Sequence, residues 1–322
     1  MRPEARARYP AAIMTTLTSE PSDRGALLAA GAVLGERYRV RRVLAVGGMG
    51  VVYQVVSLAD HQPFAIKALL PALEADRALV QRFHREAATM RLFDHPHLVR
   101  VIETFVADDR LYLVMELVAG PTLDRLASGR PLAPSRAIAL TVQILDALGH
   151  AHRAGVIHRD LKPENVVVTA RPSAAGEVDH VKVLDFGVAM VVDEAARQIG
   201  GARLTQAGFT QGTPEYMAPE QAVRGTPVDH RADLYAAGVI LFELLTGTRP
   251  FDDADRLALM HKQVYEPPPR LADVAAGRPW ATPALESVVA TALAKLPDER
   301  FASAAGMRAA LLEAAATLSD LS

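Results

Sequence analysis

Residues 158–165 of this chain read His-Arg-Asp-Leu-Lys-Pro-Glu-Asn, and this segment carries more chemical information than its surroundings. It follows an apolar tripeptide and precedes three valines, a pattern that predicts a polar loop leading into a buried strand. Asp160 can accept the proton of an attacking hydroxyl, Lys162 can neutralise a moving phosphoryl group, and Asn165 can give Mg²⁺ an oxygen ligand. An ordinary polar turn does not require these residue types at these spacings, so the segment indicates phosphoryl transfer.

A second candidate metal ligand follows twenty residues after Asn165, where residues 183–187 read Val-Leu-Asp-Phe-Gly. Taken alone, Asp185 and the glycine two positions later form an ordinary turn pattern. Its position directly after a predicted strand hairpin makes Asp185 a stronger candidate for a metal ligand. We therefore expect Asn165 and Asp185 to hold Mg²⁺.

Two upstream features suit the phosphate end of a nucleotide. Residues 45–52 read Ala-Val-Gly-Gly-Met-Gly-Val-Val between two strand patterns, where glycines let backbone N–H groups approach phosphate oxygens. Such a loop is also common as a hairpin turn, and Lys67, at the end of the apolar strand 63–69, also suits a surface lysine. Glu86 lies in the apolar stripe of a predicted helix over 76–93. We expect Glu86 to pair with Lys67, which leaves ammonium donors for the phosphates.

The periodicity of the chain changes near Gly120. From Tyr38 to Glu116, short β-branched runs separated by polar turns predict an antiparallel meander. After Gly120 helical periodicity dominates, and the stretch 233–246 is apolar nearly all round, as in a helix buried in a large lobe. The default site is then the cleft between a small β-rich lobe and a larger helical one. Strands are expected at 38–46, 51–57, 63–69, 99–105 and 111–115, and helices at 134–152, 233–246, 252–263, 285–294 and 303–316.

The segment 212–220 is interrupted by prolines and cannot form one long helix. Glu220 at its end would be an ordinary exposed carboxylate if it had no partner. Arg300 offers a guanidinium from far along the chain. A buried bidentate pair between Glu220 and Arg300 would pin the segment to the larger lobe, and we expect that pair.

Composition limits the other classes of function. The 322 residues carry a net charge of only −2, so no basic excess indicates a nucleic-acid or anionic-membrane partner. The absence of cysteine rules out disulfides and thiolate metal sites and favours a cytoplasmic location. The apolar stretches are shorter than the roughly 20 residues of a membrane span. His150 and His152 lie on different faces of a predicted helix, so we expect no transition-metal site.

Taken in order, these motifs resemble the eukaryotic-like protein kinase family from about residue 36 to about residue 316. Residues 46–53, 95–99 and 219–221 are most similar to its bacterial serine/threonine branch. The resemblance implies an α+β, two-lobed protein-kinase fold, with a small antiparallel sheet and one regulatory helix in the first lobe and a larger, mainly α-helical second lobe. The expected organisation is a flexible leader over 1–34, a kinase domain over 35–316 with lobes 35–117 and 118–316, and a tail over 317–322.

The resemblance also implies a serine/threonine protein kinase that uses ATP with Mg²⁺, or with Mn²⁺ as an alternative. Asp160 becomes the catalytic base, and Asn165 and Asp185 become the metal ligands. Ala45 replaces the first glycine of the phosphate loop, for which we expect slightly stiffer nucleotide binding and no loss of chemistry. The residues expected around the nucleotide are Ala45, Val46, Gly47, Gly48, Met49, Gly50, Val52, Ala65, Lys67, Met115, Glu116, Val118 and Val167.

Within that set, the resemblance divides the contacts with the adenine. Val52, Ala65 and Val167 would sandwich the ring. Backbone groups of Glu116 and Val118 would bond its edge.

Three further roles come from the same resemblance. Thr213 matches the position whose hydroxyl contacts Asp160 and Lys162, so we assign it to structure and catalysis. Asp233 resembles the buried helix aspartate that braces the loop 158–165. The residues expected to form a hydrophobic column in the active state are Met90, Val101, His158 and Phe186.

Regulation is expected in the segment 188–213, which is polar and glycine-dotted. Thr205 and Thr210 are the expected phosphosites, and Thr205 aligns better with the activating threonine of bacterial relatives. A phosphate there can pair with Arg159 and order the segment. Autophosphorylation of one molecule by another would require transient self-association.

Two alternatives share much of this machinery. A pseudokinase, which is a binding scaffold without turnover, would be indicated by loss of a key residue, yet the lysine, asparagine and two aspartates described above are all present. A small-molecule phosphotransferase would ordinarily lack the segment 212–220, which here resembles a platform for protein substrates. Proteins with serine or threonine acceptors are therefore the expected partners.

Overall fold

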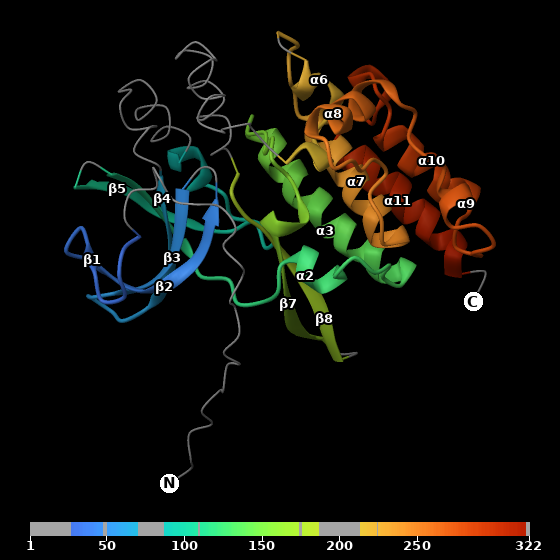
Figure 1. Cartoon of the computed structure of the whole chain (residues 1–322). Helices are drawn as coiled ribbons and strands as arrows, with labels where there is room; N and C mark the ends of the chain where they lie inside the picture. Colours follow the sequence, from blue (N-terminus) through green and yellow to red (C-terminus); the bar gives the residue numbers. More distant parts are fainter. Residues whose placement is uncertain are drawn as a thin grey trace.

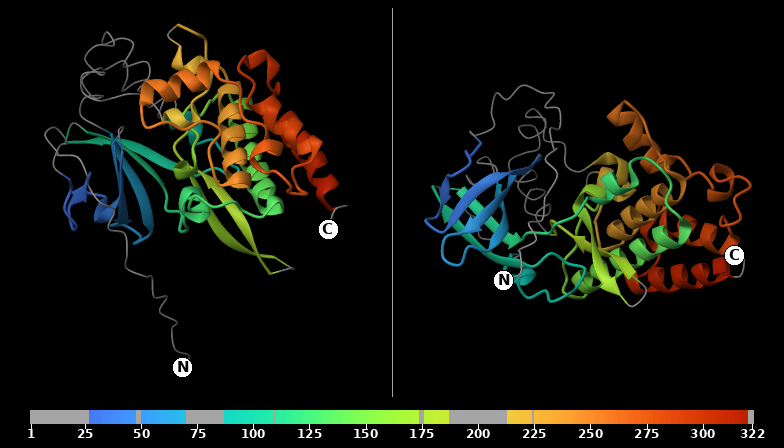
Figure 2. Two further views of the ribbon diagram at one scale, coloured as in Figure 1. Left: turned by 45° about the vertical axis from the view of Figure 1, so that its right-hand side comes forward. Right: turned by 90° about the horizontal axis from the view of Figure 1, so that it is seen from below.

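The computed structural model describes residues 27–47, 50–69, 87–108, 110–173, 176–186, 213–223 and 225–319. Figure 1 shows a strand-rich lobe beside a larger lobe of helices, and both views in Figure 2 show the same division. The two-lobed α+β architecture expected from the sequence is confirmed.

The smaller lobe is an antiparallel sheet with the strand order β1-β2-β3-β4-β6-β5. Side chains alternate between its faces, and on one face Tyr53, Ile66 and Tyr112 are fully buried in an apolar core. The antiparallel pairing predicted from the sequence is present, but the sheet departs from a simple meander, because β4 pairs with β6 and β5 lies at the edge. Its strands are β1 (Val33–Leu34), β2 (Tyr38–Gly47), β3 (Gly50–Ser57), β4 (Pro63–Leu69), β5 (Val101–Ala107) and β6 (Arg110–Glu116).

The turn between β2 and β3 depends on glycine. Gly47 pairs with Gly50 in the ladder, and Gly50 has a φ of 152°, which side chains rarely tolerate. A Cβ atom at Gly50 would clash with the carbonyl oxygen of Ala68 in β4. Glycine at this position therefore lets the beginning of β3 lie directly against β4.

The ordered sheet begins earlier than the sequence predicts. Val33–Leu34 pairs with β2, and Leu34 is buried, although both residues fall in the expected leader 1–34. The backbone N–H of Leu28 also donates to Tyr53 Oη at 3.2 Å. The apolar end of the expected leader therefore completes the core of the sheet, while residues 1–26 lie outside the described ranges.

The larger lobe surrounds α7 (Arg231–Thr246), a helix that is buried almost all round. Gly238 on this helix lies against Ala292, so α10 approaches α7 closely. This burial explains why the stretch 233–246 lacks a polar face. The other elements of this lobe are α2 (Leu123–Ala127), α3 (Pro134–Arg153), η2 (Pro163–Asn165), β7 (Val166–Ser173), β8 (Gly176–Val183), η3 (Pro214–Tyr216), α6 (Pro219–Ala222), α8 (Arg256–Tyr265), α9 (Leu271–Val274), α10 (Pro283–Ala292), η4 (Pro297–Glu299) and α11 (Ala304–Ser319).

The helix expected over 252–263 is displaced along the chain. It begins at Arg256 because Asp255 is its N-cap, with Oδ1 accepting from the N–H of Ala258 at 2.9 Å. It then continues to Tyr265. Capping chemistry, rather than the apolar pattern, determines where this helix starts.

The strand expected over 99–105 also begins later than predicted. The N–H of Val99 donates to the carbonyl oxygen of Val183 at 3.0 Å, so this residue pairs with the end of β8 in the larger lobe. The helix expected over 76–93 is described only from residue 87, and residues 87–90 are helical. Within the described ranges, no helix combines the length and hydrophobicity needed to cross a bilayer.

Candidate active site

Asp233, in the first turn of α7, braces the loop 158–165. Its buried carboxylate accepts hydrogen bonds from the backbone N–H groups of His158 and Arg159, each at 2.8 Å. His152 Nε2 lies 2.7 Å from the same carboxylate. Burial by itself raises the pKa of Asp233, but the contacts with His152 and His158 outweigh it and hold the pKa below its usual value. The most buried helix of the lobe thereby holds the loop in place, as the resemblance implied.

Asp160, Lys162 and Thr213 meet at the mouth of this loop. Lys162 Nζ lies 3.1 Å from Asp160 Oδ2 and donates to Thr213 Oγ1 at 2.7 Å. Arg159 has a left-handed φ of 64°, which turns the backbone sharply just before Asp160. The ammonium group thus lies between a carboxylate that can accept a proton and a hydroxyl on the segment 213–220. This arrangement suits transfer of a negatively charged group to a hydroxyl.

Asn165 and Asp185 lie at the base of the β7–β8 hairpin. The N–H of Leu184 donates to the carbonyl oxygen of Asn165 at 2.8 Å, so the hairpin returns the chain to Asn165. Asn165 Nδ2 donates to the carbonyl oxygen of Asp160 at 2.8 Å, which leaves Asn165 Oδ1 as the candidate metal ligand. Across the described ranges, no group of three or more histidine and carboxylate side chains could hold a metal ion. A cation between Asn165 and Asp185 would therefore share its coordination with phosphate oxygens and water.

Lys67 reaches the same site from β4. Its side chain is buried, and Nζ lies 3.0 Å from Asp185 Oδ2. A buried ammonium group requires a partner, and the Asp185 carboxylate supplies one. Glu86 lies outside the described residues, as do Gly48 and Met49, so the predicted Lys67–Glu86 pair stays a prediction.

The apolar residues expected around an adenine come from both lobes. Ala65 in β4 and Val167 in β7 are buried, and Val52 in β3 is half-buried. Ala65 pairs across the ladder with Met115 in β6. These strands therefore bring apolar side chains from distant parts of the sequence to the boundary between the lobes.

Glu116 lies at the end of β6, where the chain leaves the first lobe. Its N–H donates to the carbonyl oxygen of Arg100 at 2.9 Å, and its Oε1 lies 2.6 Å from Lys182 Nζ. Its backbone carbonyl is then the group that can bond a nucleotide base. Val118 follows two residues later and is half-buried.

The expected hydrophobic column is contiguous in the structure. The ring centroids of His158 and Phe186 are 4.5 Å apart, and His158 Nε2 lies 2.8 Å from the carbonyl oxygen of Leu184. Met90 and Val101 line the same small cavity as Phe186. The column therefore passes from the sheet to the loop 158–165.

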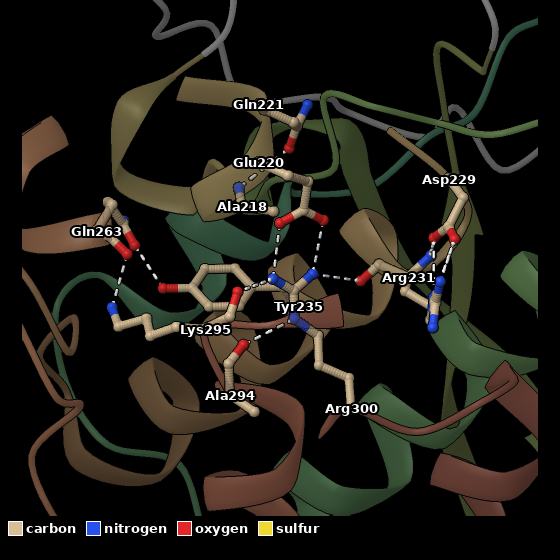
Figure 3. Close-up of polar contacts among 10 residues, drawn as sticks. All are labelled: Ala218, Glu220, Gln221, Asp229, Arg231, Tyr235, Gln263, Ala294, Lys295 and Arg300. Atoms are coloured by element: carbon tan, nitrogen blue, oxygen red, sulfur yellow. Dashed lines mark hydrogen bonds and ion pairs between the residues drawn. The ribbon is translucent and has the colours of Figure 1, made fainter. Parts of the chain in front are cut away.

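Glu220 and Arg300 form the buried bidentate pair predicted from the sequence (Figure 3). Both hydrogen bonds are 2.7 Å long, and the side chains are 3% and 0% exposed. The guanidinium group also lies over the ring of Tyr235, 4.9 Å from its centroid. The pair fastens the segment 213–220 to the larger lobe.

Sequence reasoning missed Gln263, which lies on the buried face of α8 and bonds the carbonyl oxygens of Pro214 and Glu215. The signal was a glutamine four residues after Leu259, on the face that helical periodicity assigns to the core. Sequence reasoning also missed the contact between Lys182 and Glu116. No sequence pattern relates those two residues.

The model of the protein kinase domain family matches residues 38–309. This chain belongs to the protein kinase domain family. Serine/threonine-protein kinase pkn3 of Myxococcus xanthus is 42% identical over 285 residues, which are 87% of this chain and 50% of that relative. Serine/threonine-protein kinase PknB of Mycolicibacterium smegmatis is 38% identical over 87% of this chain and 43% of its own length.

The fold of this kinase domain is also similar to solved structures. The PknI kinase domain of Mycobacterium tuberculosis superposes with a TM-score of 0.68 at 28% identity, covering 89% of this chain and 100% of that one. The match places this chain in the two-lobed kinase fold. The chain spans only about half or less of the length of the curated relatives named above.

Proposed function

We propose that this kinase domain transfers the γ-phosphoryl group of ATP to serine or threonine hydroxyls of protein substrates. The observation that carries the proposal is the position of Lys162 Nζ, which contacts both Asp160 and Thr213. The contact brings a carboxylate, a cation and the segment 213–220 to one point. Its relatives' names, which describe serine/threonine-protein kinases, support the same acceptor class.

Each side chain has a separate task in this reaction. Asp160 accepts the proton of the acceptor hydroxyl, and Lys162 stabilises the charge on the phosphoryl group in flight. Lys67 binds the nucleotide phosphates, and Glu86 orients Lys67. Positioning and charge stabilisation supply most of the catalysis in such transfers.

Family membership implies ATP and a divalent cation, which we propose is Mg²⁺, with Mn²⁺ as an alternative. The donor set fits, because Asn165 Oδ1 and the Asp185 carboxylate are hard oxygen ligands. Such a cation supplies positive charge to the phosphate oxygens. Asn165 is oriented by its bond to the carbonyl oxygen of Asp160, and Asp185 by its contact with Lys67.

We further propose that autophosphorylation at Thr205, or at Thr210 as the second choice, raises activity by pairing the phosphate with Arg159. Both threonines lie outside the described residues, and the polar composition of 188–213 supports the proposal. The step requires transient self-association. A cytoplasmic location is our expectation from the cysteine-free composition.

The experiment is incubation with labelled ATP and Mg²⁺, followed by phosphosite mapping on the kinase and on a peptide library. Transfer to serine or threonine peptides that is abolished in Asp160→Asn supports the proposal. If the protein binds nucleotide but transfers no phosphate to itself or to any peptide, even at high protein concentration, it is instead a pseudokinase scaffold. Phosphorylation of a small molecule but of no peptide would identify the alternative phosphotransferase.

A further inference from the structure

The helix α8 has two different faces. Leu257, His261 and Tyr265 are exposed on the outer face, while Leu259 and Gln263 are buried on the inner face. Gln263 is 1% exposed, which is unusual for a glutamine. A buried carboxamide is tolerated only where its donors and its acceptor are satisfied, so its partners indicate its role.

Gln263 uses both ends of its carboxamide. Nε2 donates to the carbonyl oxygens of Pro214 at 3.0 Å and Glu215 at 2.9 Å. Oε1 accepts from Tyr235 Oη at 2.6 Å, and Figure 3 shows this contact between α8 and α7. Two carbonyl oxygens can accept only from the amide nitrogen, so the orientation of the carboxamide follows from its partners.

The two carbonyl oxygens belong to the turn η3, which directly follows Thr213. Thr213 Oγ1 accepts from Lys162 Nζ at 2.7 Å, so η3 begins immediately after the residue that contacts Lys162. At the other end of its carboxamide, Gln263 accepts a hydrogen bond from Tyr235, and the guanidinium of Arg300 lies over the ring of that tyrosine. Gln263 therefore connects η3 to the same buried framework that holds Glu220.

We propose that Gln263 is a positioning residue for the protein substrate. It fixes the backbone of the turn 214–216 so that an acceptor hydroxyl bound along it reaches Asp160. The inference rests on the proposed kinase activity and goes beyond it, because it assigns substrate placement to a side chain of α8. None of the contacts described for Gln263 reaches Lys67, Asn165 or Asp185, so its removal should spare nucleotide binding.

The test is Gln263→Met, which keeps the length of the side chain and removes all three hydrogen bonds. In steady-state assays with a peptide substrate found by the library screen, KM for the peptide should rise about tenfold or more. KM for ATP should stay within about twofold of wild type. Gln263→Asn, which keeps a carboxamide but is one methylene shorter, is the milder variant if Gln263→Met fails to fold.

The matched control is Tyr235→Phe, which removes the bond to Gln263 Oε1 and leaves both bonds to η3 in place. It should lower thermal stability, measured as Tm, through loss of one buried hydrogen bond, but leave KM for the peptide near wild type. The inference is overturned if KM for the peptide is unchanged in the folded Gln263 variant, or if it rises equally in Tyr235→Phe. It is also overturned if KM for ATP rises in parallel. Failure of the wild-type protein to phosphorylate any peptide would instead overturn the proposed function.

Discussion

Arg159 and Asp185 have φ values of 64° and 58°, in the left-handed region that few residues other than glycine adopt. Such conformations cost about 1–3 kcal/mol each and persist where the surroundings impose them. The N–H of Arg159 is held by Asp233, and the carboxylate of Asp185 by Lys67. The strained backbone directs Asp160 and Asp185 toward the same site, which is a reason for the fold to retain it.

The first prediction at the scale of single residues concerns Lys67→Met. The variant should fold yet retain less than about a tenth of wild-type turnover, which for kinases is roughly 1–100 per second. Loss of the ammonium group removes the charge to which we assign phosphate binding, and it removes the contact of Lys67 with Asp185. Phosphate transfer to a peptide measures the effect.

Arg37→Met is the matched control for Lys67→Met. It removes a more exposed ion pair with Glu103 in the same lobe, and such pairs contribute only about 0–1 kcal/mol. Turnover of the control should be close to that of wild type. Retention of more than about a tenth of turnover in Lys67→Met would show that its role is misassigned.

The second prediction separates chemistry from metal binding. Asp160→Asn should bind ATP with Mg²⁺ as wild type does, because Asp160 is assigned to the acceptor hydroxyl. Asp185→Asn should lose the dependence of nucleotide affinity on Mg²⁺, because it removes the charged oxygen ligand that we propose for the cation. Calorimetric titration of ATP with and without Mg²⁺ decides this. Equal affinities in all three proteins would contradict the division of roles.

At the scale of elements, polar side-chain contacts fasten η3 and α6 to the rest of the larger lobe. Glu220 of α6 binds Arg300, and Gln263 of α8 binds the backbone of η3. Gln221 supplies a third, since its Nε2 donates to the carbonyl oxygen of Arg159 at 2.9 Å. The segment therefore holds its shape through side-chain contacts, because its prolines prevent a continuous helix.

The third prediction follows from this arrangement. Arg300→Met should lower the free energy of unfolding by about 3–5 kcal/mol, because it leaves the Glu220 carboxylate buried and unpaired. The double variant Glu220→Met/Arg300→Met should recover part of that loss, since neither charge remains. Denaturant unfolding measures both.

Arg308→Met provides the comparison for Arg300→Met. Arg308 pairs with Asp146 at 2.8 Å near the surface, so its loss should cost about 0–1 kcal/mol. A loss of similar size in Arg300→Met would contradict the importance assigned to the buried pair.

At the scale of the whole molecule, the two lobes are joined by contacts from the hairpin β7–β8. Lys182 in β8 contacts Glu116 and the carbonyl oxygen of Leu98, and Val183 bonds the N–H of Val99. Within the larger lobe, Asp233 of α7 accepts hydrogen bonds from the backbone of the loop 158–165. The site is thus assembled from both lobes, and its integrity depends on global folding.

The fourth prediction is a pH dependence of global stability. The pKa of Asp233 is lowered in the folded protein, so its ionisation contributes stability above the unfolded value of about 3.9. That contribution is lost as pH falls through the lower folded pKa. The difference in free energy of unfolding between wild type and Asp233→Asn should therefore shrink as pH falls from about 5 toward 2.

Denaturant unfolding of both proteins across this pH range measures the effect. At neutral pH the difference should be about 1–3 kcal/mol, because charged hydrogen bonds to buried N–H groups are lost. A difference that grows as pH falls from about 5 toward 2 would contradict the prediction.

The residue types and spacings of 158–165 and 183–187 were sufficient to predict the loop and the hairpin that follows it, and they are the basis of the chemistry proposed for both. A catalytic loop requires particular side chains at particular separations along the chain, and these separations are visible in the amino-acid sequence. Periodicity likewise predicted the two lobes, because burial of one face imposes the pattern on the sequence. The buried helix over 233–246 was predicted from the absence of a polar face. The Glu220–Arg300 pair was predictable because a carboxylate and a guanidinium that are both buried have few other solutions.

Other features were decided by the tertiary structure alone. The start of α8 depends on which nearby carboxylate caps it, and the entry into β5 on the pairing of Val99 with Val183. The bonds from Gln263 to η3 join residues 48 and 49 positions apart, through a helix whose sequence gives no sign of its neighbour. Periodicity shows that a side chain is buried, but the identity of its partner depends on how separate elements pack in three dimensions.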